Sequence, residues 1–426
     1  MNQIPSSLSA NRRSVYIAVA AMCMVATFPG RTHGLGLITE SILQDLALDR
    51  TIYGYYNLWA TLIGALFCIP IGSMLDRSGC RKVLSTVLLG LGISVICMSM
   101  VQSKLLFFIC LVLTRGFGQS ALSVASITLI SKYFPKSKLG YSMGIYSVLT
   151  SVFFMLAFWA MGAALENISP WTIGFTGNDI VLPAWRIAWC GLGLILLFVC
   201  VPTVLFCVRS RHTIQGEEKE SGQENSVEPD GIPFARAIRT PSFWIFGLSI
   251  SFFGLVSSGI GLNNEDILSE RGFDVKMYHF LMILPLPFGL LSNLAIGYLA
   301  RYVRITYLLI FSLFFTGLAK FLFPFIQTPA QVYAYTIVLA VAGGGLSVLF
   351  FIAWAHIFGQ RDVGKIQGVA QMMSVFASAL GPIFFAYSKE WTNSYTLAFY
   401  ISGVLTILFA VSACFIKTEK TMNDER

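Results

Sequence analysis

Twelve apolar runs, each long enough to cross a lipid bilayer, constrain the fold of this chain more than any other feature. A membrane-spanning helix needs about 20 predominantly apolar residues. The runs fall at residues 14–38, 52–75, 83–101, 105–130, 139–165, 187–208, 242–262, 278–299, 305–325, 332–358, 367–387 and 397–416. Because lipid cannot satisfy backbone polar groups, each run is expected to be a helix. The predicted fold class is an all-α membrane protein.

The overall composition agrees with this prediction. Hydrophobic residues make up 56% of the 426 residues and charged residues only 12%, against about 25% charged residues in soluble domains. A net charge of +8 would suit nucleic acid only if the basic residues were clustered on one wet face. Here they stand at the ends of apolar runs. We therefore exclude nucleic acid as a partner and expect the lipid bilayer instead.

A polar stretch and the distribution of basic residues predict domains and orientation. Residues 209–240 carry acidic residues among Gly, Ser and Pro, which is typical of a solvated linker. It separates predicted six-helix bundles at 1–208 and 241–426. Of 29 Lys and Arg residues, 20 fall on the side of the linker and both termini and six on the other. Since cytoplasmic loops are enriched in these residues, we expect both termini to be cytoplasmic in a plasma or inner cell membrane.

An internal repeat relates the two halves. With a shift of 225 or 224 residues, Gly34, Gly36, Glu40 and Gly72 fall on Gly259, Gly261, Glu265 and Gly297, and Gly140 and Gly144 on Gly364 and Gly368. Six-span repeats in the same orientation are typical of secondary transporters, which bind substrate between the halves near the midplane. The sequence therefore predicts twelve transmembrane helices in two pseudo-symmetric six-helix bundles.

The loop after the second run carries a recognisable motif, Gly72-Ser73-Met74-Leu75-Asp76-Arg77-Ser78-Gly79-Cys80-Arg81-Lys82. It resembles the signature loop of the major facilitator superfamily. That resemblance implies a twelve-helix transporter in which Gly72, Asp76, Arg77, Gly79, Arg81 and Lys82 form a conformational lock between helix ends. A merely positive-inside loop is the alternative. In the second half Arg301 replaces Asp76, so the two loops cannot work identically.

Two arginines inside apolar runs are the main candidates for substrate binding. Arg115, followed by glycine in the fourth run, also resembles a superfamily pattern, and Gln119 continues its helical face. Arg31 lies in the first run beside Pro29-Gly30 and close to His33. Charged residues at such depth usually face a protein interior or a watery cavity, although packing against helix ends is the alternative. The repeat places Val256 and Ser258 opposite Arg31 and His33, so the cationic character belongs to the first half.

Other polar residues give less specific signals. Tyr146, Asn264 and Gln371 are further candidates for substrate binding, but small polar residues also hold membrane helices together. Lys320 falls in the ninth run, which the resemblance places at the periphery, and we interpret it as a side chain that reaches the interface.

Two other patterns exclude bound groups. Residues 359–365 have P-loop spacing, but Ile366 replaces the Ser or Thr that binds magnesium and no strand precedes it. Nucleotide binding is therefore rejected. The nine cysteines lack metal-ligand spacing, so neither a metal site, a disulfide nor a cofactor is expected.

The nature of the cargo follows from an imbalance of charge. No Asp or Glu accompanies Arg31 and Arg115 at depth, and a buried cation needs a counter-charge. A guanidinium fits a carboxylate bidentately, so the substrate is expected to supply one. Gly381-Pro382, Asn393-Ser394-Tyr395 and Phe399-Tyr400 resemble the oxalate and monocarboxylate branches of the superfamily. Those branches place basic residues in the eighth and eleventh runs, where this sequence has none.

The sequence thus predicts a monomeric secondary active or facilitative transporter without catalytic residues. It would move a small anionic or zwitterionic metabolite, most simply a carboxylate, by alternating access through a cationic cavity. Coupling to a proton or to a counter-anion stays open. One alternative is a carrier of amino acids or other polar metabolites with proton coupling through His33. Another is a non-transporting receptor or scaffold on the same fold.

Overall fold

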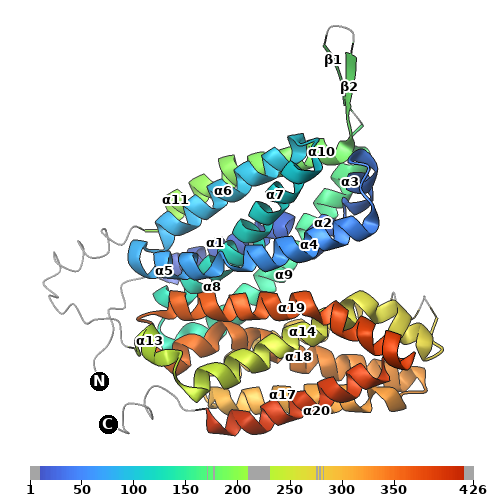
Figure 1. Cartoon of the computed structure of the whole chain (residues 1–426). Helices are drawn as coiled ribbons and strands as arrows, with labels where there is room; N and C mark the ends of the chain where they lie inside the picture. The colour runs from blue at the N-terminus through green and yellow to red at the C-terminus, as the bar shows by residue number, and fades with distance from the viewer. Residues whose placement is uncertain are drawn as a thin grey trace, which may run out of the picture. The chain divides into compact units, whose positions relative to one another are not determined.

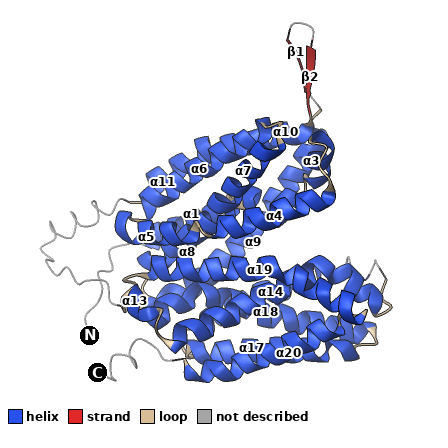
Figure 2. Ribbon diagram, in the orientation of Figure 1, coloured by secondary structure: helices blue, strands red, loops and turns tan. Residues whose placement is uncertain are grey.

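The computed structural model describes residues 10–169, 171–175, 178–209, 231–274, 277, 280–281 and 283–416. These residues are almost entirely helical (Figures 1 and 2). Eleven of the described helices are long and apolar enough to cross a membrane, and the shorter apolar helix α16 (Pro285–Leu299) lies where the eighth span was expected. The predicted all-α membrane fold is therefore confirmed. Residues 210–230 of the expected linker lie outside the described residues.

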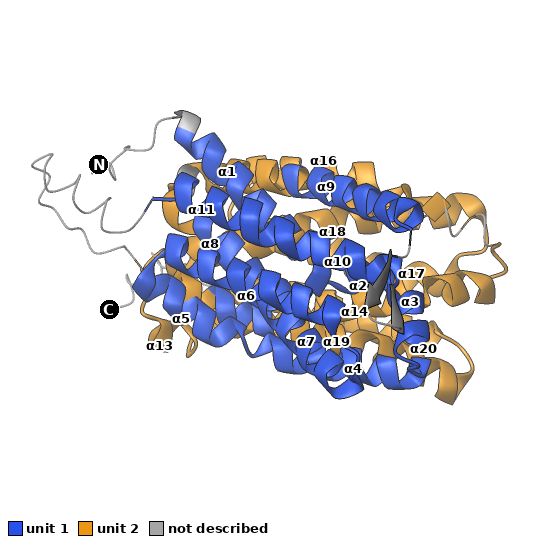
Figure 3. Cartoon of the chain, turned by 90° about the horizontal axis from the view of Figure 1, so that it is seen from above, with its two compact units in different colours: residues 1–129, 149–227, 367–372 blue, residues 130–148, 228–366, 373–426 orange. Residues whose placement is uncertain are grey.

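The chain divides into two compact units, coloured blue and orange in Figure 3. Unit 1 comprises residues 1–129, 149–227 and 367–372, and unit 2 comprises residues 130–148, 228–366 and 373–426. The main boundary lies inside the expected linker at 209–240. Two short segments, 130–148 and 367–372, group with the unit opposite to their half of the sequence.

Unit 1 is built from short and long helical segments that follow the first six apolar runs. They are α1 (Ala10–Val25), η1 (Phe28–Gly30), α2 (Thr32–Gly36), α3 (Thr39–Asp45), α4 (Arg50–Ala65), α5 (Cys68–Ser78), α6 (Cys80–Met100), α7 (Lys104–Thr114), η2 (Arg115–Leu122), most of α8 (Ser123–Tyr133), the later part of α9 (Lys136–Asn167), α10 (Ala184–Ile195), η3 (Leu196–Cys200) and α11 (Val201–Cys207). The spans are interrupted more often than the sequence predicted.

A β-hairpin between α9 and α10 was not predicted. Strand β1 (Trp171–Phe175) pairs antiparallel with β2 (Asn178–Leu182), so that Trp171 lies opposite Leu182 and Phe175 opposite Asn178 (Figure 2). The segment lies outside the apolar runs, which carry the signal for helices. Its sequence signal was a two-residue Thr-Gly connection between β-branched and aromatic residues.

Unit 2 contains the later helices. They are α13 (Phe234–Ala237), α14 (Pro241–Glu270), α16, α17 (Ile305–Leu322), η4 (Phe323–Phe325), α18 (Pro329–Phe358), most of α19 (Val363–Thr392), α20 (Thr396–Ser412) and η5 (Ala413–Phe415). An aromatic core lies where α14, α19, α20 and η4 meet. The rings of Phe323 and Phe399 stack with centroids 4.1 Å apart, and Phe385 meets Phe399 edge-on at 5.6 Å.

A close helix contact between two glycines occurs in both units, and one glycine of each pair is related to the other by the repeat. In unit 1, a Cβ added at Gly193 of α10 would lie 3.0 Å from the carbonyl oxygen of Gly92 of α6. In unit 2, a Cβ at Gly317 of α17 would lie 3.0 Å from the carbonyl oxygen of Gly403 of α20. Gly92 and Gly317 are related by the repeat shift of 225 residues. Only glycine permits backbones to approach this closely. The sequence repeat is therefore accompanied by a repeated close contact between helices.

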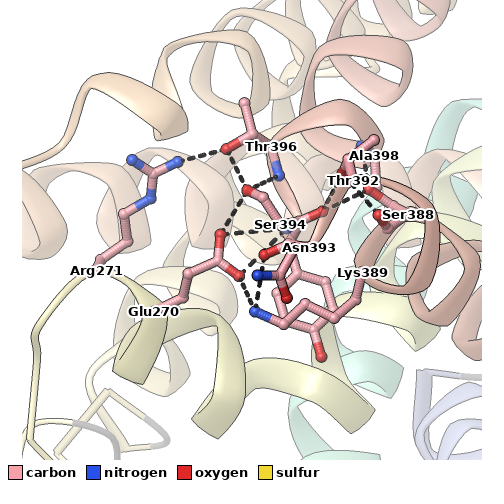
Figure 4. Close-up of polar contacts among 10 residues, drawn as sticks. Glu270, Arg271, Ser388, Lys389, Thr392, Asn393, Ser394, Thr396 and Ala398 are labelled. Atoms are coloured by element: carbon pink, nitrogen blue, oxygen red, sulfur yellow. Dashed lines mark hydrogen bonds and ion pairs between the residues drawn. The ribbon is translucent and has the colours of Figure 1, made fainter.

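A second repeat-related pair consists of two carboxylates, each of which joins helical segments within its own unit. Asp45, at the end of α3, accepts hydrogen bonds from Trp185 Nε1 (2.9 Å) and Arg186 Nε (2.6 Å) at the start of α10. Glu270, at the end of α14, is its equivalent at a shift of 225 residues. Its carboxylate accepts from Lys389 Nζ (2.8 Å) in the last turn of α19 and from Ser394 Oγ (2.6 Å) just before α20 (Figure 4).

Glu270→Gln tests the importance of this carboxylate in unit 2. The variant loses the ion pair with Lys389, and the amide matches the donor groups of Lys389 and Ser394 less well than the carboxylate does. We expect the free energy of unfolding to fall by about 1–3 kcal/mol. Thermal melting of the detergent-purified chain measures the effect. Glu265→Gln is the matched control, because Glu265 lies in the same helix and its carboxylate forms no ion pair among the described residues. Equal melting temperatures for the two variants would show that the contacts of the Glu270 carboxylate do not stabilise the protein.

Candidate functional site

The first span is broken at the position that the Pro29-Gly30 pair predicted. Helix α1 gives way to the 3₁₀ turn η1, Arg31 is extended with φ −93° and ψ 150°, and α2 begins at Thr32. The break brings two backbones together, because a Cβ at Gly30 would lie 2.4 Å from the carbonyl oxygen of Thr114 at the end of α7. Irregular backbone at membrane depth is tolerated where protein or a cavity covers it. The break therefore aims Arg31 and Thr32 at the fourth span.

The Arg31 guanidinium contacts several neutral groups of unit 1. Its Nε donates to Thr27 Oγ1 (2.7 Å) and its Nη2 lies 3.0 Å from Met24 Sδ and 3.3 Å from Ser123 Oγ. The guanidinium carbon is 5.5 Å from the centre of the Phe154 ring. Polar contacts on one side and an aromatic face on another fix the direction of the side chain.

Arg115 is buried more deeply, with 2% of its surface exposed. Its Nη1 donates to Thr32 Oγ1 (3.0 Å) and Gln119 Oε1 (2.9 Å), and its Nη2 donates to Asn57 Oδ1 (2.7 Å). All three acceptors are uncharged, and within the described part of the chain Arg115 forms no ion pair. Its Nε has no hydrogen-bond partner there either. The guanidinium is thus held in place while its charge stays uncompensated.

A π-helical turn positions Arg115 and Gln119. The segment η2, which runs from Arg115 to Leu122, is wound as a π-helix between α7 and α8. Such turns are rare inside α-helices and are frequent at functional sites. Gln119 contacts Arg115 and Ser123 contacts Arg31, whereas Ser126 donates to the carbonyl oxygen of Ala20 (2.8 Å).

Three of the predicted substrate-binding residues lie together in the structure, and two residues that were not predicted join them. Arg31, Arg115 and Gln119 lie together in unit 1 with Thr32 and Asn57, which sequence reasoning missed. Asn57 had a signal, since it is an amide in the apolar second span. That signal alone is also compatible with helix packing.

The other four predicted binding residues lie outside the hydrogen-bonded cluster. His33 follows Thr32 on α2, where it is exposed and within electrostatic reach of both Arg31 and Arg115. Gln371 of α19 is partly exposed and groups with unit 1. Tyr146 and Asn264 belong to unit 2. Tyr146 is 1% exposed, with its ring edge-on to Phe351 at 5.8 Å, and Asn264 is partly exposed near the end of α14. Their role in substrate binding stays a prediction.

The predicted lock loop is a tight helix-to-helix turn. Gly79 ends α5 and precedes α6 with φ 81°, a conformation that favours glycine. Gly72 is buried, and a Cβ at Gly368 of α19 would lie 3.4 Å from its Cα. Asp76 and Arg81 are partly buried, while Arg77 and Lys82 are exposed. A lock function for these residues stays a prediction.

The segment with P-loop spacing has a structural use. Asp362, just before α19, accepts from Lys365 Nζ and from the backbone N–H of Phe234, each at 2.8 Å. Gln360 Nε2 donates to the carbonyl oxygens of Ser131 (2.8 Å) and Phe134 (2.9 Å). These side chains join the end of the linker to the ends of α8 and α18, rather than surrounding a phosphate.

The interpretation of Lys320 as an interfacial side chain is wrong. Lys320 lies in the last turn of α17 and is 1% exposed. Its ammonium nitrogen lies 5.7 Å from the centre of the Phe253 ring of α14. The peripheral position expected for the ninth span does not decide the direction of one side chain, and here the lysine points into the protein.

The chain combines apolar helices related by a repeat with a cluster of two arginines in unit 1. These features are typical of a multi-pass membrane carrier. The sequence model of the Major Facilitator Superfamily matches residues 15–263 and 247–425, so the chain belongs to that superfamily and is a transporter rather than an enzyme. Monocarboxylate transporter 10 of Rattus norvegicus is 24% identical over 421 residues, which cover 94% of this chain and 77% of that protein. The probable L-galactonate transporter of Escherichia coli (strain K12) is 20% identical over 420 residues, covering 92% and 86%.

Solved structures show the same fold. The human organic anion transporter MFSD10 (TETRAN) aligns with a TM-score of 0.68 at 13% identity, covering 95% of this chain and 100% of that one. The Escherichia coli fucose:proton symporter FucP aligns with a TM-score of 0.69 at 10% identity, covering 95% and 98%. The family and the fold of the chain are therefore established, as is the existence of a small-molecule substrate.

Gly30→Ala tests the close approach that shapes the arginine cluster. The added Cβ meets the Thr114 carbonyl, so we expect a destabilisation of about 1–3 kcal/mol from overpacking. Gly36→Ala is the control, because a Cβ there meets nothing within 4 Å. Melting of the two purified variants is compared with the wild type. A Gly30→Ala protein as stable as the Gly36→Ala protein would refute the tight contact.

Asp362→Asn tests the linker junction through its pH dependence. Burial alone raises the pKa of Asp362, but hydrogen bonds from Lys365 and the Phe234 N–H outweigh it and hold that pKa below its ordinary value. A lowered carboxyl pKa stabilises the fold above about pH 3.9, and this contribution is lost as the pH falls further through the folded-state pKa. The wild type should therefore melt higher than the variant at pH 7, and the difference should shrink below about pH 4. A difference that is independent of pH would argue against this ion pair.

Proposed function

We propose that this transporter moves a small organic anion or zwitterion, most simply a monocarboxylate, across a cell membrane by alternating access. The substrate carboxylate would bind at the cationic cluster of Arg31 and Arg115 in unit 1. One observation carries the proposal, namely a guanidinium that is 2% exposed and surrounded by neutral acceptors.

The energetics of burial support an anionic cargo. Removing a cation from water is costly unless an opposite charge and hydrogen bonds compensate it. Thr32, Gln119 and Asn57 satisfy N–H groups of Arg115 but supply no negative charge. An arriving carboxylate would supply that charge and could exchange with these neutral acceptors on the planar guanidinium fork. The site would then bind anions more tightly than neutral analogues of the same shape.

The comparisons support the same class of substrate. One relative is named a monocarboxylate transporter, another a probable transporter of L-galactonate, and one structural neighbour is an organic anion transporter. All three names denote carriers of anions. The amino-acid alternative shares the carboxylate and differs by an ammonium group, so the transport assay must include both substrate classes.

The transport cycle is proposed from the lock loop and the repeat. Gly72, Asp76, Arg77, Gly79, Arg81 and Lys82 would hold helix ends together in one access state. Coupling to a proton, through His33 or another group, or exchange for a counter-anion completes the cycle. We further propose a monomer with both termini in the cytoplasm.

Uptake by Arg115 variants tests the anion site. Proteoliposomes are assayed with labelled monocarboxylates, neutral amides of the same acids and zwitterionic amino acids. Arg115→Leu should lower carboxylate uptake by roughly 10-fold to 100-fold, since a charge-assisted hydrogen bond contributes about 1.5–3 kcal/mol. Arg115→Lys should retain part of the activity, because it keeps the charge and loses the fork.

Arg50→Gln is the matched control, since Arg50 is an exposed arginine paired with Glu40. Its uptake should equal that of the wild type. Melting curves establish that each variant is folded. Unchanged carboxylate uptake in a folded Arg115→Leu protein would refute the anion site, and absence of uptake of every substrate class by the wild type would refute the proposed substrate range.

A further inference from the structure

A line of buried polar side chains runs along one face of α17 in unit 2. Ser312, Thr316 and Lys320 are 1%, 0% and 1% exposed. Residues four apart lie on the same face of a helix, so the three side chains form one stripe. At 1.5 Å per residue the stripe is about 12 Å long.

The stripe lacks hydrogen-bond partners. Within the described residues, Ser312 Oγ, Thr316 Oγ1 and Lys320 Nζ are all buried without one. Buried polar groups in native proteins are almost always satisfied, and each exception requires an explanation. Three successive exceptions on one helix face indicate that a ligand or ordered solvent completes them.

The charge of Lys320 narrows the choice of ligand. No described carboxylate forms an ion pair with it. The neighbouring elements offer the ring of Phe253 from α14 and the buried, unpartnered hydroxyl of Tyr335 from α18, which packs on Phe323 just beyond Lys320. Water can satisfy the hydroxyl groups, but it does not compensate the positive charge that Lys320 carries when it is protonated. An anion would satisfy both the hydroxyl donors and that charge, and it is therefore the ligand that the stripe favours.

The packing of α18 sets an upper limit on the size of that anion. A Cβ at Gly345 would lie 2.8 Å from Ser312 Oγ, and a Cβ at Gly343 would lie 3.1 Å from the Phe253 ring. Backbone and side chains thus crowd the stripe from α18 and α14. Room for a ligand beside the stripe is therefore limited, which favours a monatomic ion over a metabolite with a carbon skeleton.

We propose that Lys320, Thr316 and Ser312 form a binding site for a small monovalent inorganic anion of halide size in unit 2. The ammonium group and the Thr316 hydroxyl both donate to the ion, and Ser312 extends the line of donors along α17. This site belongs to a different unit from the Arg31–Arg115 cluster. It does not depend on the proposed substrate, and its anion stabilises the fold of unit 2.

Thermal melting in different salts tests the site. The full-length chain in detergent is melted in sodium methanesulfonate and, at constant ionic strength, in sodium chloride and sodium bromide. Ligands that bind the native state raise the melting temperature. We expect the halides to raise it by about 2 °C or more in the wild type. The same rise is expected in Arg115→Leu, which separates this site from the proposed substrate site.

Variants of the stripe should lose the halide response. Lys320→Met should abolish it and Thr316→Val should reduce it. Thr128→Val is the matched control, because Thr128 of α8 in unit 1 is also buried with an unpartnered hydroxyl, and it should keep the full response. If Lys320→Met fails to fold, chloride NMR line broadening by the wild type and by Thr316→Val decides the question.

Three results would overturn the proposal. They are a wild type insensitive to halide, a folded Lys320→Met protein with the full halide response, and equal chloride line broadening by the wild type and Thr316→Val. A response that disappears in Arg115→Leu and persists in Lys320→Met would place the halide at the arginine cluster instead, and would likewise overturn the proposal.

Discussion

Charged side chains and unpaired backbone groups are costly to bury in a low-dielectric interior, and the structure of this transporter depends on how they are satisfied. The two arginines of the cluster in unit 1 contact neutral groups: Arg31 donates to Thr27 and lies near Ser123, and Arg115 donates to Asn57, Gln119 and Thr32. The broken first span and the π-turn of the fourth span bring those groups within reach. Irregular backbone at depth thus serves to satisfy charged side chains, which regular helices would leave isolated.

The regular helices around these irregular segments pack in a similar way in the two units. Glycines at equivalent places let α6 meet α10 in unit 1 and α17 meet α20 in unit 2. Asp45 joins α3 to α10 in unit 1, and Glu270 joins α14 to the end of α19 in unit 2. Their partners differ, since Asp45 pairs with an arginine and Glu270 with a lysine and a hydroxyl. The repeat therefore preserves the position of the carboxylate, whereas its partners come from different places.

The arginine cluster was partly predictable from the sequence. Arg31, Arg115 and Gln119 stood out because charge and amide groups are rare in apolar runs. Asn57 and Thr32 did not, because a single small polar residue fits helix packing equally well. The direction of Lys320 was misjudged for a related reason. A long flexible side chain can reach either the interface or the interior, and only its neighbours decide which.

The amino-acid sequence by itself determined that the chain is helical, crosses a membrane many times and is built from two repeated halves. These properties follow from hydrophobicity summed over about 20 residues and from glycine spacing, both of which are local or periodic. The tertiary structure decided which polar groups meet. The π-turn at Arg115, the hairpin at Trp171–Leu182 and the grouping of residues 130–148 with unit 2 depend on contacts between distant segments, and no periodicity encodes those contacts.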